Sequence, residues 1–282
     1  MIDKKLISIP ISYHRYLSLN LSLIDFYPNT LIESIWLIPL GFVAGLLGSI
    51  IGLGGGIIIV PVLTFVGFSP TLAVSNSLFA VFSNSVASTA VYAKQKRIEL
   101  SLGWKLGLIA VPGTVLGAFI SSDLSREIFK ILFALVLLAA ASYIFLKRKI
   151  EGKTLDTSRI LLVFSAGASF FAGIISSLFG VGGGLIFVPL MVVALGISMK
   201  RAAPTSQFIL MFASFSGLIV HSILGHPDYY QALLLSIGAF AGGILGARLS
   251  LEIKETKLKI IVIIVIVAAA IKLIIDSTGI FQ

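Results

Sequence analysis

The sequence predicts an all-α membrane protein, a polytopic helical bundle of two inverted repeats with about 8 to 10 membrane segments. Each repeat is expected to hold a glycine-broken helix pair followed by three uninterrupted spans. Composition gives the first indication, because 57% of the 282 residues are hydrophobic and 12% are charged, whereas soluble proteins have about 25% charged residues. An internal duplication and an uneven distribution of Lys and Arg give the other two indications.

Apolar runs long enough to cross a bilayer define the elements of this bundle. A helix of about 20 residues spans the hydrocarbon core of roughly 30 Å. In chain order we expect a broken element at 35–67, spans at 70–93, 102–121 and 128–147, a second broken element at 160–196, and spans at 201–223, 230–249 and 257–275. An outer-membrane barrel is excluded, because stretches such as Ile261–Ile271 do not alternate between apolar and polar residues.

The chain contains two copies of one unit. Gly52 aligns with Gly180 at an offset of 128 residues, and after one inserted residue the offset is 129, so that Ser77 matches Ser206. The expected organisation is an N-terminal tail at 1–31, repeat 1 at 32–149, a linker at 150–158, repeat 2 at 159–276 and a C-terminal tail at 277–282. We expect the N-terminal tail to be interfacial or poorly ordered, with a cleaved signal or a real span as the alternatives.

The distribution of Lys and Arg predicts how the two copies are oriented. If each broken element crosses once, the basic residues outside the N-terminal tail divide ten to eight between the two sides, which is scarcely a bias. If each broken element enters and returns as two short helices, the copies are inverted and the division is fifteen to three. Since cytoplasmic connectors are rich in basic residues, we predict the inverted arrangement. Its cytoplasmic group comprises Lys94, Lys96, Arg97, Lys105, Lys147, Arg148, Lys149, Lys153, Arg159, Lys200, Arg201, Arg248, Lys254, Lys257 and Lys259.

Each break is a run of glycines inside an apolar stretch, GLGGGIIIVP at Gly52–Pro61 and GVGGGLIFVP at Gly180–Pro189. Glycine adopts positive φ and brings no side chain that would block a ligand. A short helix is expected to begin near Ile57 in the first copy and near Leu185 in the second. A helix that begins inside the membrane directs unpaired N–H groups and its positive dipole end into the protein, and such places bind anions. A tight hairpin or close helix packing is the alternative explanation of the glycines.

Uncharged hydrogen-bonding side chains follow each break. Ser75–Ser77 is matched by Pro204–Ser206, which Gln207 follows, and a second group at Ser83–Ser85 is matched in part by Ser214. Such side chains bind an oxyanion without the desolvation cost of a buried Lys or Arg, although bonding within the helices is the alternative. The predicted substrate-binding residues are Gly54, Gly55, Gly56, Asn76, Ser77, Gly182, Gly183, Gly184, Thr205, Ser206 and Gln207.

The remaining composition argues against other function classes. All twelve acidic residues fall in connectors, tails or span ends, whereas intramembrane carboxylates mark cation sites and proton relays, so a transporter of Na⁺ or metal ions is disfavoured. The chain has no Cys and no HExxH motif, and GLGGG lacks the Lys-Ser/Thr of a nucleotide-phosphate loop. We therefore expect no enzyme activity, no catalytic residues, no metal and no cofactor. The net charge of +9 reflects the connectors, and no nucleic acid partner is expected.

Two further features have mainly structural interpretations. His221 lies at the end of a span, and His226 precedes Asp228 in the next connector. The simpler interpretation is that these histidines lie at the membrane interface with their hydrogen bonds satisfied, and a role in proton coupling is the alternative. Three glycine pairs at helical spacing predict close packing faces between spans; these are Gly41/Gly45, Gly113/Gly117 and Gly242/Gly246.

The doubled G-x-GGG-x-I-x-VP motif is accompanied by AVSNSL at 73–78, AAPTSQ at 202–207, and LGA at 116–118 and 245–247. With these motifs, residues 34–275 resemble the TauE/SafE family of sulfite and organosulfur anion exporters. The resemblance implies a multi-pass protein of the plasma membrane that moves small sulfur oxyanions or sulfonates, generally outward.

The predicted function is secondary transport of a small anion, with export of sulfite, thiosulfate or a sulfonate by alternating access. One repeat would rock against the other around a shared site near the membrane midplane. A passive anion channel, a non-transporting membrane scaffold and an uptake transporter are the alternatives. The predicted partners are the small anionic substrate and the lipid bilayer, while the oligomeric state is not predicted.

Overall fold

The computed structural model describes residues 34–146, 159–252, 267 and 270–271. Every regular element within these ranges is a helix, which confirms the predicted helical class. In chain order the helices are α3 (Leu37–Ile51), α4 (Gly56–Phe65), α5 (Pro70–Lys94), α6 (Leu100–Asp123), α7 (Arg126–Leu146), α8 (Arg159–Phe179), α9 (Gly184–Pro189), the π-helix η1 (Leu190–Ala194), α10 (Met199–Ile223) and α11 (Tyr229–Leu249). Both predicted tails, the linker and nearly all of the predicted span at 257–275 lie outside the described residues.

The predicted spans at 70–93, 102–121, 128–147, 201–223 and 230–249 agree with observed helices to within a few residues. Among the described helices, α6, α10 and α11 are long and apolar enough to cross a membrane. Helix α5 is as long as α10 but carries Ser and Asn residues in its interior. Its start is set by local chemistry: Pro70 occupies the first turn, and the Ser69 hydroxyl accepts the Leu72 N–H at 3.4 Å. The Asp228 carboxylate caps α11 in the same way.

Both predicted breaks are present. Helix α3 ends at Ile51 and is capped by Gly52, which has a φ of 87°, and α4 starts after Gly55, which has a φ of 89°. The second copy breaks between α8 and α9, where Gly183 has a φ of 71°. Gly55 packs back against Ala44 of α3, so the chain reverses within the protein. With 15 and 10 residues, α3 and α4 are about 22 and 15 Å long, and each is shorter than a hydrocarbon core of about 30 Å.

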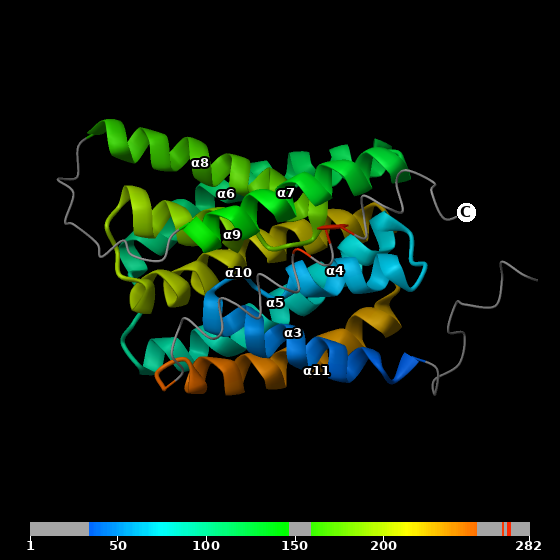
Figure 1. The fold of residues 1–282 in the computed structure, drawn as a ribbon, viewed down its shortest axis with the longest axis horizontal. Coiled ribbons are helices and arrows are strands. Elements are labelled where there is room, and N and C mark those ends of the chain that lie inside the picture. The colour runs from blue at the N-terminus through cyan, green and yellow to red at the C-terminus, as the bar shows by residue number, and fades with distance from the viewer. Residues whose placement is uncertain (1–33, 147–158, 253–266, 268–269, 272–282) are drawn as a thin grey trace, which may run out of the picture.

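The helices pack as two flanking layers around α5 and α10. Helix α3 packs along α11, α6 packs along α8, and α5 and α10 contact each other between these pairs. In Figure 1 the helices run side by side along the horizontal axis, with α6 and α8 above and α3 and α11 below. Helix α7 lies against the end of α8, where Phe133 stacks on Phe179 with ring centroids 5.2 Å apart.

Glycines make the closest helix contacts, and these contacts are reciprocal between the two copies. Gly113 of α6 faces the backbone of Phe170 in α8, and Gly242 of α11 faces the backbone of Phe42 in α3. The members of each contact are related by the offsets of the internal duplication. The predicted packing role of these glycines is therefore confirmed.

Candidate functional site

The two glycine breaks meet at one buried place. A Cβ built on Gly54 would lie 2.9 Å from Leu210 Cδ1 and 3.0 Å from Val81 Cγ1, and one built on Gly182 would lie 2.7 Å from the same Val81 atom. Val81 belongs to α5 and Leu210 to α10, and the duplication relates the two positions. Both breaks therefore contact the same apolar pair, where the central helices touch.

The start of each half-helix faces the opposite break. Gly56, the first residue of α4, lies against the carbonyl oxygen of Gly180, and Gly184, the first residue of α9, lies against that of Gly52. Neither helix start has a side-chain cap, because a glycine occupies the capping position. The first N–H groups of α4 have no partner within the helix and lie at its positive dipole end. In this arrangement a carbonyl dipole of the other copy faces each start.

Two predicted hydroxyl residues hold the breaks across the interface between the copies. The Ser77 hydroxyl donates to the Gly180 carbonyl oxygen at 2.9 Å, and the Ser206 hydroxyl donates to the Gly52 carbonyl oxygen at 2.7 Å. Both serines are fully buried. The structure therefore brings Ser77 and Ser206 to the breaks together with Gly54–Gly56 and Gly182–Gly184.

Gln207 is the centre of a polar cluster that, among the described residues, lies on one side of the breaks. Its Nε2 donates to the Gly48 carbonyl oxygen at 2.8 Å. Its Oε1 accepts from the Ser85 and Ser88 hydroxyls, each at 3.3 Å, and from Asn84 Nδ2 at 3.5 Å. Asn84 Nδ2 also contacts the Gly54 carbonyl oxygen at 3.2 Å. The residue of repeat 1 that matches Gln207 is Leu78, so the other side has no such amide.

Asn84 and Ser88 belong to the polar cluster around Gln207 but not to the predicted set of binding residues. Both are fully buried, and Asn84 Oδ1 has no hydrogen-bond partner among the described residues. The signal for Asn84 is its spacing, because it lies seven residues after Ser77 on α5 and therefore near the same face of the helix.

Asn76 and Thr205 have different partners from their serine neighbours. The Thr205 hydroxyl accepts the Glu99 N–H at 2.9 Å, and Asn76 Oδ1 accepts the Asp228 N–H at 3.0 Å. Glu99 and Asp228 are the residues before α6 and α11 and are matched by the duplication. The structure thus places the oxygen atoms of Asn76 and Thr205 where they hold the connectors after α10 and α5. Asn76 Nδ2 also donates to Gln231 Oε1 of α11 at 3.2 Å, and the Thr205 hydroxyl donates within its own helix.

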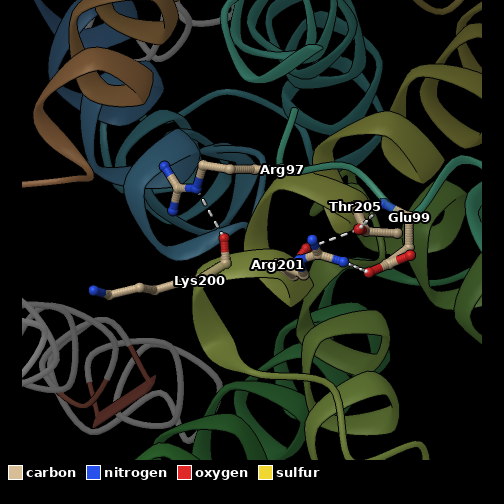
Figure 2. A network of polar contacts seen from close by, with 5 residues as sticks. All are labelled: Arg97, Glu99, Lys200, Arg201 and Thr205. Carbon is tan, nitrogen blue, oxygen red and sulfur yellow. Dashed lines mark hydrogen bonds and ion pairs between the residues drawn. The ribbon is translucent and has the colours of Figure 1, made fainter. Parts of the chain in front are cut away.

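The connector after α5 is also held by charged residues (Figure 2). Arg97 Nε donates to the Lys200 carbonyl oxygen at 2.9 Å, and Glu99 forms an ion pair with Arg201 at the start of α10. The side chains of Arg201 and Glu99 are 56% and 37% exposed, so water screens the pair and its stabilising effect is small. No group of three or more His, Asp or Glu side chains able to hold a metal ion occurs in the described part of the chain.

Comparison with known proteins identifies the relatives of this chain. Residues 37–273 match the profile of the family described as Sulfite exporter TauE/SafE. The probable membrane transporter protein YunE of Bacillus subtilis is 31% identical over 87% of this chain and 98% of its own length. MJ0441 of Methanocaldococcus jannaschii, a probable membrane transporter protein, is 31% identical over 79% of this chain and 89% of its own length. YfcA of Escherichia coli K12, also named a probable membrane transporter protein, is 23% identical over 84% and 87%. No solved structure matches the chain.

Proposed function

Because the chain belongs to the TauE/SafE family of membrane transporters, we propose that it is a secondary transporter of small sulfur-containing anions. The substrates are sulfite, thiosulfate or sulfonates, and the direction is export across the plasma membrane. The observation that carries the proposal is the meeting of two buried, glycine-capped half-helix starts at one place between the two copies.

The chemistry of this place suits an oxyanion. The N–H groups at the two half-helix starts are donors, and the hydroxyls of Ser77 and Ser206 and the amide of Gln207 lie beside the breaks. Helix N-termini favour negative charge, and neutral donors avoid the desolvation cost of a buried cation. An anion would bind these donors in place of the carbonyl oxygens of Gly180 and Gly52, which accept the hydroxyls of Ser77 and Ser206.

Entry of the anion requires the breaks to separate. Gly54 and Gly182 are both in contact with Val81 and Leu210, so the described arrangement is closed at its centre. Rocking of one copy against the other would break the bonds from Ser77 to Gly180 and from Ser206 to Gly52. The reciprocal contacts of the two copies support an inverted-repeat carrier, in which this separation exposes the same place to either side alternately.

A flux assay tests the proposal. Proteoliposomes that contain the purified protein are loaded with radiolabelled sulfite, thiosulfate or taurine. The efflux of the label is compared with the efflux of neutral solutes and with the efflux from liposomes without protein. A carrier gives saturable flux and counterflow driven by unlabelled substrate. Unitary currents at channel rates would show that the protein is a passive channel and not a carrier. The absence of both flux and binding for all of these anions would refute the proposed site.

A further inference from the structure

His221 and His226 form a pair at the end of the molecule where α10 passes into α11. Their Nδ1 atoms lie 2.9 Å apart, and their ring centroids are separated by 5.0 Å. His221 Nε2 lies 3.1 Å from the Ser177 carbonyl oxygen near the end of α8. His226 Nε2 lies 3.4 Å from the Ser122 hydroxyl of α6. The pair therefore connects α6, α8 and α10 at one end of the bundle.

These contacts determine the tautomers of the neutral pair. The Ser177 carbonyl can only accept, so His221 carries its proton on Nε2, and its Nδ1 is an acceptor. His226 must then donate from Nδ1, which leaves His226 Nε2, beside the Ser122 hydroxyl, as the unprotonated basic nitrogen. A proton entering the pair binds there, because His221 is fully buried and both of its nitrogens are engaged.

The other copy holds non-titrating counterparts of this pair at the opposite connector. The duplication matches His221 with Tyr92 and His226 with Arg97. The contacts also correspond, since the Tyr92 hydroxyl donates to the Ser49 carbonyl oxygen at 2.8 Å and the Arg97 guanidinium lies 5.2 Å from the centre of the Tyr92 ring. One end of the molecule is thus held by an arginine with a permanent charge, and the other by two imidazoles.

The surroundings of the histidine pair favour its neutral form. Burial lowers the pKa of His226 below its ordinary value. The groups that face the pair from α6 and α8 are the Ser122 hydroxyl and the Ser177 carbonyl, which carry no charge. The Asp228 carboxylate in the same connector accepts the N–H groups of Tyr230 and Gln231. No hydrogen bond or ion pair joins a carboxylate to either ring within the described residues.

We propose that His221 and His226 are a proton-binding latch, which holds the α10–α11 end closed when neutral and releases it on taking up one proton. A cation on the half-buried His226, beside the fully buried His221, is less well solvated than one in water, whereas a histidine that moves into water regains its ordinary pKa of about 6.5. The open form therefore binds the proton more tightly, and acid shifts the equilibrium toward it. The closed form is fully favoured above about pH 6.5 and loses its advantage as the pH falls below that value.

Cysteine accessibility measures this opening without reference to transport. The natural chain has no Cys, so Ser177→Cys places a single thiol in a fully buried position directly behind the pair. Ser49→Cys is the matched control, because Ser49 is equally buried and occupies the same position in the other copy. Both full-length variants are reacted with N-ethylmaleimide in lipid nanodiscs at pH 7.5 and at pH 5.5. The ratio of the two rates removes the shared effect of pH on the thiolate.

We expect the rate at position 177 relative to position 49 to rise about tenfold between pH 7.5 and pH 5.5, the limit for one proton with an open-state pKa near 6.5. Replacing His226 by the residue of the other copy, His226→Arg, should abolish this rise, and His226→Asn should do the same if the arginine variant does not fold. An unchanged ratio in the parent protein, or an equal rise in the His226 variants, would overturn the latch.

The role of the latch in transport rests on the proposed function, and it is tested by a separate measurement of anion flux. Sulfite flux in proteoliposomes should depend on pH in the parent protein and lose that dependence in His226→Arg. If the thiol ratio changes with pH while no anion is moved, the proton latch is retained and the proposed transport function is refuted. If flux depends on pH while the thiol ratio does not, the latch is refuted and transport is retained.

Discussion

The contact between the two glycine breaks predicts that one added carbon at Gly56 destabilises the protein. A Cβ there would overlap the Gly180 carbonyl oxygen and lie 2.9 Å from both Ser77 Oγ and Val181 Cα. Ordinary contacts begin near 3.4 Å, and the obstructing carbonyl is buried backbone that no rotamer change can move. Overpacking of this kind costs about 1–3 kcal/mol, so Gly56→Ala should lower the stability by this amount and should reduce anion flux by forcing the breaks apart.

Gly167 in α8 supplies the control for this substitution. A Cβ on Gly167 has no neighbour within 4 Å, and alanine is a better helix former than glycine by about 1 kcal/mol. We expect Gly167→Ala to unfold at the same or a slightly higher temperature than the parent protein in detergent and to transport normally. If Gly56→Ala unfolded at the same temperature as Gly167→Ala and retained full flux, the close approach of the two breaks would be disproved.

Three further substitutions test the contacts around the breaks. Ser206→Ala removes one interhelical hydrogen bond and should cost about 1 kcal/mol in the unfolding equilibrium; an unchanged stability would contradict the bond to Gly52. Gln207→Leu installs the residue of the other copy and leaves buried polar groups without partners, so we expect the free energy of unfolding to fall by about 1–3 kcal/mol. In an anion-binding titration, Gln207→Leu should also lower the affinity more than Ser206→Ala does. Arg201→Gln removes an exposed ion pair and should change the stability by less than about 1 kcal/mol; a loss well above that value would refute a solvent-screened contact.

The positions of the breaks were predictable because glycine and proline are rare inside apolar helices. The half-helices were expected near Ile57 and Leu185, and they begin one residue earlier, at Gly56 and Gly184, since the preceding glycine already supplies the positive φ. The π-helix at Leu190–Ala194 was not predicted. It follows Pro189 directly, where the missing N–H and the ring of the proline disturb the regular hydrogen-bond ladder.

The assignment of side chains to the site was only partly predictable. Successive residues of a helix point about 100° apart, so Ser77 contacts a break while its neighbour Asn76 holds a connector. An amphipathic surface helix reveals its inner face by polarity, but α5 is buried on several faces and places polar residues on more than one of them. Asn84 and Ser88 are absent from the predicted set because their partner Gln207 belongs to the other copy, and the pairing depends on how α5 and α10 cross.

In the proposed carrier, the departures from the duplication would make the two ends of the molecule respond differently. Contacts that hold the fold are repeated with exchanged partners, as for Ser77 with Gly180 and Ser206 with Gly52. A carrier in which every contact was repeated would respond identically from both sides of the membrane, because its two closed ends would have equal energies. Gln207 against Leu78 and His226 against Arg97 break this equality, one beside the breaks and one at the connectors. Exchanging His221 and His226 with their counterparts Tyr92 and Arg97 should therefore move the pH sensitivity from position 177 to position 49 in the thiol assay. A pH response that stays at position 177 would show that it does not depend on the histidine pair.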